Sequence, residues 1–179
     1  MKVQRITYLL IFLILVNCVK GKAKENDSTE EALAYLYSLY PNSDQLNREK
    51  LSEVTSFYLR DTAITDDKMK YLLIFPNLDD LKLTKTKITW AGLEVLKNNK
   101  IRSLDIDFTP ASNESIKVLR DWKHLKILNI SYTNIDDGAV EDLLKLNIGS
   151  LEAAGTKLSE KAIERLRKKM SVETEDYEL

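Results

Sequence analysis

The stretch LDDLKLTKTKITWAGLEVL, residues 78–96, decides the fold because variants of it recur along most of the chain. The copies start at intervals of 24, 23, 24 and 23 residues, at Val54, Leu78, Ile101, Leu125 and Ile148. Repetition at this period, without insertions, is typical of a solenoid in which each repeat packs only on its neighbours. The sequence therefore predicts five stacked repeats rather than an ordinary globular core.

Positions 1, 4, 6, 11, 16 and 19 are apolar in every copy. Positions 4 and 6 alternate with polar residues, which is the period of a strand with one buried face. Positions 16 and 19 are spaced i, i+3, which places both side chains on one face of a short helix. The pattern predicts an α/β fold with one strand and one short helix in each repeat.

Two polar positions fit the same unit. A hydroxyl at position 9 can bond the backbone where the chain leaves the strand, and stacked copies would form a ladder. Threonine fills this position in every copy, as Thr62, Thr86, Thr109, Thr133 and Thr156. Position 12 always holds a residue that favours the helix N-cap. These residues are Thr65, Thr89, Ser112, Asp136 and Ser159.

The first repeat contains a cluster of charged residues, Arg60, Asp61, Asp66 and Asp67. Such clusters can bind metals or move protons. Asp66 and Asp67, however, directly follow a predicted N-cap, where carboxylates favour the positive end of the helix dipole. No histidine or cysteine accompanies them, so we interpret them as helix-start residues and expect neither a metal nor a cofactor.

The pattern LxxLxLxxTxI followed by a capped helix resembles the leucine-rich repeat family, especially bacterial versions with threonine at position 9 in place of asparagine. The resemblance covers residues 54–170. It implies a solenoid with a curved parallel sheet on the inner, concave face and helices outside. It also implies that the ends of the stack are capped.

Residues 28–53 fit a helical N-terminal cap. A first helix would place Leu33, Leu36, Tyr37 and Tyr40 on one inward face and stop at Pro41. A second would turn Leu46 and Leu51 inward. At the other end, we expect the acidic residues 171–179 to form a mobile tail.

The N-terminus differs from the repeats. Lys2 and Arg5 precede an apolar run over residues 6–16, which has the length of a secretory signal peptide. We interpret residues 1–17 as that signal, with a buried N-terminal helix as the alternative. Removing them leaves 25 basic and 28 acidic side chains. The remaining chain therefore lacks the excess of basic residues that is typical of a nucleic-acid-binding protein.

The stretch LVNC, residues 15–18, resembles the bacterial lipobox, although Asn17 stands where a small residue is usual. The resemblance implies that Cys18 is acylated and becomes the mature N-terminus. The alternative is an incidental apolar cysteine. Residues 18–27 would then form a tether that holds an exported, lipid-anchored protein at the bacterial cell envelope.

The resemblance to the leucine-rich repeat family implies that the concave sheet face binds a protein partner. The candidate partner-binding residues on its strands and strand ends are Tyr58, Arg60, Lys82, Asp105, Asp107, Phe108, Asn129 and Tyr132. Because adjacent strands lie about 4.8 Å apart, Phe108 and Tyr132 should be side-by-side anchors. Alternatively, Phe108 turns inward to fill the space left by Ala111. We expect Lys82 and Asp105 to form a cross-strand ion pair.

Two other functions remain open. Asp105 and Asp107 share one face of a strand about 7 Å apart, a spacing that resembles the carboxylate pair of an inverting glycosidase. An open sheet, however, offers no deep pocket to desolvate a catalytic acid. We therefore expect a protein without catalytic activity, with a hydrolase or a purely structural envelope protein as alternatives. The partner's identity and the oligomeric state stay open.

Overall fold

A computed structural model describes residues 28–39 and 46–175. The predicted signal peptide, the tether, Cys18, Tyr40 and residues 176–179 lie outside these ranges. Within them, every helix is too short or too polar to cross a membrane.

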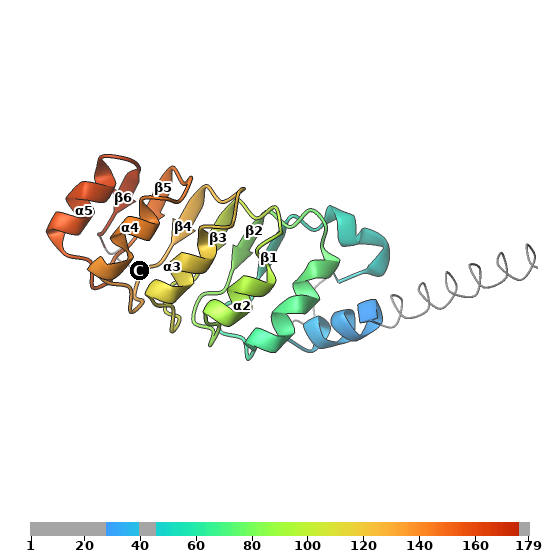
Figure 1. The fold of residues 1–179 in the computed structure, drawn as a ribbon. Coiled ribbons are helices and arrows are strands. Elements are labelled where there is room, and N and C mark those ends of the chain that lie inside the picture. Colours follow the sequence, from blue (N-terminus) through green and yellow to red (C-terminus); the bar gives the residue numbers. More distant parts are fainter. Residues whose placement is uncertain (1–27, 40–45, 176–179) are drawn as a thin grey trace, which may run out of the picture.

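The repeats form one parallel sheet whose six strands follow the order of the chain (Figure 1). The strands are β1 (Ser56–Tyr58), β2 (Asp80–Lys82), β3 (Ser103–Asp105), β4 (Ile127–Asn129), β5 (Ser150–Glu152) and β6 (Ser171–Glu173). Strands pair in register, so equivalent repeat positions lie side by side. Tyr58 thus pairs with Lys82, and Asp105 with Asn129.

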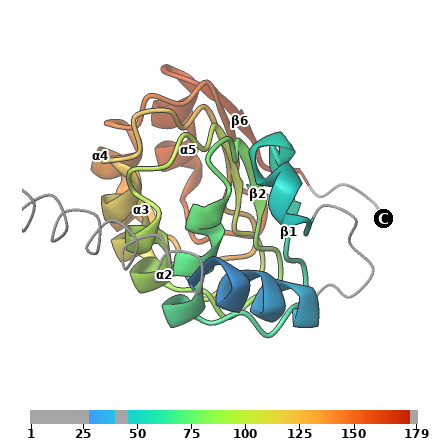
Figure 2. The same ribbon diagram turned by 90° about the vertical axis from the view of Figure 1, so that its right-hand side faces the viewer.

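One helical segment follows each of the first five strands. These segments are the 3₁₀ helix η2 (Asp66–Ile74), α2 (Trp90–Val95), α3 (Asn113–Leu119), η3 (Asp137–Ala139) continued by α4 (Val140–Leu143), and α5 (Glu160–Arg167). Figure 2, which looks along the stack, shows the helices on one side and the strands on the other. The predicted α/β solenoid with one strand and one short helix per repeat is confirmed.

The core lies between the two layers and consists of the repeated apolar positions. All but one of these side chains are buried, and most of the leucines are completely inaccessible. The exception is Leu158 in the fifth repeat, which is only partly buried and is followed by no further complete repeat among the described residues. Full burial of a leucine or isoleucine stabilises the fold by roughly 1.5–3 kcal/mol, so these columns hold the stack together.

The threonine hydroxyls bond the backbone as predicted, and each bond stays within its own repeat. Each donates to the carbonyl three residues earlier in its own repeat, at 2.6–2.9 Å. The bonds therefore close the turn after each strand. The preceding residue, at position 8, adopts a left-handed backbone in every repeat, with φ between 52° and 59°.

Neighbouring repeats are joined where their helices begin. The Asp66 carboxylate accepts hydrogen bonds from the Thr89 amide at 2.9 Å and hydroxyl at 2.6 Å, in the next repeat. Asp137 accepts the same pair from Ser159, both at 2.7 Å. The acidic residues at the helix starts thus bind the next N-cap, a role beyond their interaction with the helix dipole. We call these two contacts the inter-repeat clasps.

Two predictions about the ends are wrong. In the helix over residues 28–39, Leu36 is buried, but Tyr37 is 51% exposed and does not face the core. The expected tail begins instead as β6, in which Val172 is buried and pairs with Leu151. The second cap helix is present as the 3₁₀ helix η1 (Arg48–Glu53), and Leu46 and Leu51 pack against the core.

Candidate binding face

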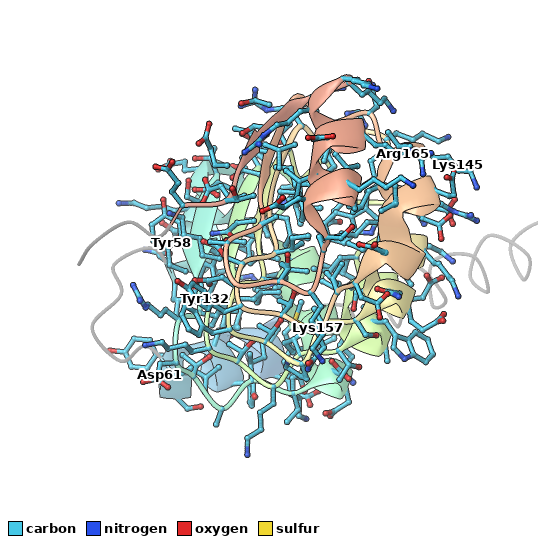
Figure 3. The ribbon with its side chains drawn as sticks, turned by 90° about the vertical axis from the view of Figure 1, so that its left-hand side faces the viewer. Tyr58, Asp61, Tyr132, Lys145, Lys157 and Arg165 are labelled. Carbon is cyan, nitrogen blue, oxygen red and sulfur yellow. The ribbon has the colours of Figure 1, made fainter. Side chains whose placement is uncertain are left out.

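The sheet face opposite the helices carries the residues at repeat positions 3, 5, 7 and 8, and we call it the open face. Side chains at positions 4 and 6 point into the core, so the alternation of the strand turns their neighbours outward. In Figure 3, Tyr58 and Tyr132 lie on this face, on the opposite side of the molecule from Lys145 and Arg165. All eight predicted partner-binding residues lie on it or at its edge.

Phe108 and Tyr132 stack on each other. Their ring centroids are 4.2 Å apart and the ring planes differ by 13°, while 44% and 39% of their surfaces remain exposed. The alternative in which Phe108 fills space beside Ala111 is therefore wrong. Both residues occupy the left-handed position after their strands, which turns the rings to the same edge of the open face.

The aromatic pair has a neighbour from the adjacent repeat on each side. The Lys85 ammonium lies 5.4 Å from the centroid of the Phe108 ring. On the other side, a Cβ built on Gly155 would lie 2.5 Å from Cδ1 of Tyr132, so this ring needs a residue without a side chain beside it. Sequence reasoning missed Lys85 and Gly155, although both occupy position 8 of their repeats.

Beside the aromatic pair is a hollow of about 170 Å³. It is lined by Arg60, Asp107, Phe108, Asn129, Ser131, Tyr132, Glu152, Ala154, Glu173 and Glu175. Five of the eight predicted residues thus come together around one depression. The sequence did not indicate Glu173 and Glu175 as site residues, because the acidic composition of residues 171–179 predicted a mobile tail. The apolar–polar alternation from Met170 to Glu173 was the signal for a further strand.

The surroundings of Asp105 and Asp107 differ from the prediction that an open sheet would leave both carboxyls solvated. Burial and a hydrogen bond with the Asp107 carboxyl raise the pKa of Asp105 to about 7, so an open sheet does desolvate an acid here. Oδ1 of Asp107 is buried without a hydrogen-bond partner among the described residues.

Asp105 and Asn129 also have a local structural task. Each side chain accepts a hydrogen bond from the amide two residues later, at 3.1 Å from Asp107 and 2.9 Å from Ser131. These contacts fix the end of the strand, as Asx turns do. Two of the predicted binding residues therefore stabilise the backbone that presents their neighbours.

The N-terminal part of the open face is organised around Tyr58. Its hydroxyl donates to Oδ2 of Asp80 at 3.1 Å, and the Lys82 ammonium lies 5.2 Å from its ring centroid. No ion pair between Lys82 and Asp105 occurs among the described residues, so that prediction is wrong. Tyr58 nevertheless remains 48% exposed.

The described residues contain no group of three His, Cys, Asp or Glu side chains arranged to hold a metal ion. The hollow is also below the size of an ordinary small-molecule site, which is about 300–1,000 Å³. Its arrangement suits the insertion of one or a few side chains from another molecule.

Comparison with known proteins identifies the architecture. Neither a protein-family model nor a curated protein matches the sequence. The crystal structure of an internalin, InlF of Listeria monocytogenes, is similar with a TM-score of 0.52 and 17% sequence identity, over 80% of this chain and 50% of that one. Internalin C2 of the same organism gives a TM-score of 0.45 and 19% identity, over 81% and 74% of the two chains.

The chain thus spans half the length of the InlF structure, and identity at this level concerns the fold alone. Together with the six-stranded parallel sheet and its alternating short helices, the likeness shows that the chain has a leucine-rich-repeat fold with a helical N-terminal segment.

Proposed function

We propose that this chain is a non-catalytic module that binds a protein partner on its open face. The observation that carries the proposal is the exposed stack of Phe108 on Tyr132, which the fold maintains with both residues in the left-handed region. For a bulky residue that conformation costs roughly 1–2 kcal/mol. Aromatic side chains are enriched among the residues that dominate protein interfaces.

The shape of the site favours a protein partner over a small molecule. The hollow is small, whereas the open face extends across all six strands and offers a broad, shallow surface. Specific protein interfaces bury about 800 Å² on each partner, more than one shallow hollow supplies. The aromatic pair would be the anchor, with the polar positions of the neighbouring strands around it.

Photo-crosslinking in cells tests this proposal. A photoreactive phenylalanine analogue replaces Ile127, which is 46% exposed on the open face, or Trp90, which is 49% exposed at the start of α2 on the helix side. The two sites match in exposure and apolar character. We expect a discrete crosslinked species from position 127 and none from position 90. Crosslinking only from position 90, or from neither, would contradict the proposal, and the latter result would favour a purely structural role.

Export and lipid attachment are part of the same proposal. They rest on the basic start, the apolar run over residues 6–16 and the position of Cys18. Metabolic labelling with palmitate should label the wild-type chain, and detergent partition should place it in the detergent-rich phase. Cys18→Ser should lose the label and move to the aqueous phase. A variant that partitions like the wild type would favour an uncleaved apolar anchor.

Hydrolysis is a second candidate because of one observation. The pKa of Asp105 rises to about 7 through burial and its contact with Asp107, and a carboxyl that titrates near neutral pH can serve acid–base chemistry. Asp105→Asn and Asp107→Asn should then abolish turnover of a glycan or peptide substrate. A ligand-bound structure with nothing near these carboxyls would rule the candidate out.

A further inference from the structure

The charges on the open face are distributed unequally between its two ends. Arg60, Lys82 and Lys85 lie at the β1–β2 end, together with Asp61 and Asp80. From β3 to β6, positions 5 and 7 and their equivalents after β5 carry five acidic side chains, three uncharged ones and no lysine or arginine. The acidic residues are Asp105, Asp107, Glu152, Glu173 and Glu175. We call this part of the open face, from β3 to Glu175, the acidic half.

The carboxylates of the acidic half form no ion pairs among the described residues, although Lys82 on β2 faces Asp105. No ion pair of the described residues involves Glu152, Glu173 or Glu175, and Oδ1 of Asp107 is buried without a hydrogen bond. The helix side differs, because many of its acids are paired with bases. These pairs are Glu94–Lys97, Glu114–Lys117, Asp142–Arg120 and Glu141–Arg165. Negative charge is therefore left uncompensated mainly where the aromatic pair is exposed.

The hollow combines this charge with apolar surface. Four carboxylates line it, against the single guanidinium of Arg60 at the end nearest β1. Phe108 and Tyr132 form one wall, and Ala154 is part of the lining. A long side chain with an apolar stem and a cationic head matches both properties, because lysine and arginine bury their stems and keep the charge at polar groups. The volume of about 170 Å³ suits a side chain rather than a folded element.

We infer that the partner presents a cationic segment, with lysine or arginine, to the acidic half, and that one such side chain enters the hollow beside Phe108 and Tyr132. The inference rests on the proposed protein-binding function and specifies the chemistry of its partner. Charge complementarity of this kind fixes orientation and excludes partners of the wrong sign.

Binding of peptides to the protein as it is isolated from the membrane fraction, held in mild detergent that keeps a lipidated or an apolar N-terminus dispersed, tests the inference. The probes are two labelled peptides of equal length and aromatic content, one with lysine and arginine and the other with glutamate at the same positions. Fluorescence anisotropy should show that the basic peptide binds at least about tenfold more tightly than the acidic one. Added salt should weaken this binding, because exposed charges are screened.

Two double variants locate the binding. The variant Glu152→Gln with Glu173→Gln removes two unpaired charges from the acidic half. It should weaken the binding of the basic peptide about tenfold. Glu160→Gln with Glu164→Gln removes two exposed charges from α5 on the helix side and should leave binding unchanged. Thermal unfolding confirms that both proteins are folded. Equal weakening by the two variants, or equal binding of both peptides, would overturn the inference.

The crosslinked partner separates this inference from the proposed function. Mass spectrometry of the species captured from position 127 identifies the segment that contacts the open face. A segment with lysine or arginine supports the inference. A captured segment that lacks both residues would overturn the inference while the protein-binding proposal stands, whereas absence of any crosslink would overturn the protein-binding proposal itself.

Discussion

The ring of Tyr132 occupies the space that a side chain on Gly155 would need. A Cβ on Gly155 would lie 2.5 Å from Cδ1 and 2.7 Å from Cε1 of this ring, and the backbone of Gly155 is left-handed with φ of 59°. Position 8 is filled by a larger residue in the other four repeats, so the left-handed turn alone does not require glycine. The glycine is needed because it lets Tyr132 lie flat against the next repeat and stack on Phe108.

Gly155→Ala should therefore disturb the aromatic pair without removing either ring. We expect the Tyr132 ring to move outward and the free energy of unfolding to fall by about 1 kcal/mol, since alanine also disfavours the left-handed backbone. Near-ultraviolet circular dichroism would report the loss of the stack, and chemical denaturation the stability. Gly149→Ala is the control, because a Cβ there meets no atom within 4 Å. An unchanged aromatic signal in Gly155→Ala would contradict this account.

The inter-repeat clasps should contribute measurably to stability. Asp66→Ala and Asp137→Ala each remove a carboxylate that accepts two hydrogen bonds from the next repeat. Bonds to a charged group are stronger than neutral ones, so we expect each change to lower the midpoint of urea denaturation measurably.

Glu160→Ala provides the matched control for the clasps. Glu160 occupies the same repeat position, but among the described residues no N-cap of a further repeat follows it. Its replacement should change the free energy of unfolding by less than about 0.5 kcal/mol. Similar losses at positions 66, 137 and 160 would show that these acids act only through the helix dipole.

Asp105 should make stability fall as the pH rises toward neutrality. Its pKa is raised to about 7 in the folded protein, from about 3.9 in an unfolded chain, so folding favours the protonated acid. The contribution is fully present below pH of about 4 and is lost as the pH rises through about 7. The groups facing Asp105 are Lys82 on β2, Asp107 after β3 and the uncharged Asn129 on β4.

The difference in unfolding free energy between wild type and Asp105→Asn isolates this effect. The amide can still accept the hydrogen bond from the Asp107 backbone, as Asn129 does from Ser131. Between pH 5 and pH 8 the wild type should lose about 1–2 kcal/mol relative to the variant, a value that allows for partial exposure of the carboxyl. Asp79, whose pKa is lowered by its hydrogen bonds to Arg102, contributes stability that is lost only as the pH falls below about 4, so the difference between wild type and Asp79→Asn should not vary between pH 5 and pH 8. A difference that does not vary with pH would mean that Asp105 titrates normally.

The sequence predicted the repeats, strands and core because these depend on a period that each copy repeats. Leu104, Leu128 and their equivalents are buried for the same reason, and no long-range information is needed to place them. β6 was missed because Val172 follows Leu151 by 21 residues, shorter than the preceding intervals, and because no complete repeat surrounds it. The prediction for Tyr37 was wrong because helical spacing shows which side of a helix is apolar, but not how many residues of that side the neighbouring repeat buries.

The candidate site was predictable in position but not in detail. Strand spacing is enough to place Phe108 beside Tyr132. Whether the rings point outward depends on the left-handed backbone of position 8 and on the glycine in the next repeat. Lys82 contacts Tyr58 rather than Asp105 because a flexible side chain has several neighbours within reach. The raised pKa of Asp105 depends on burial that a linear pattern does not specify.

The affinity of a Phe108→Ala and Tyr132→Ala double variant for the crosslinked partner tests the central claim most directly. We expect binding to weaken by about 1–3 kcal/mol for each anchor, while the free energy of unfolding changes by less than about 1.5 kcal/mol, the value of an aromatic stack. Leu128→Ala gives the contrast, because it empties a buried position and should cost about 2–5 kcal/mol of stability. Wild-type affinity in the double variant, or destabilisation by Phe108→Ala as large as that of Leu128→Ala, would contradict the account.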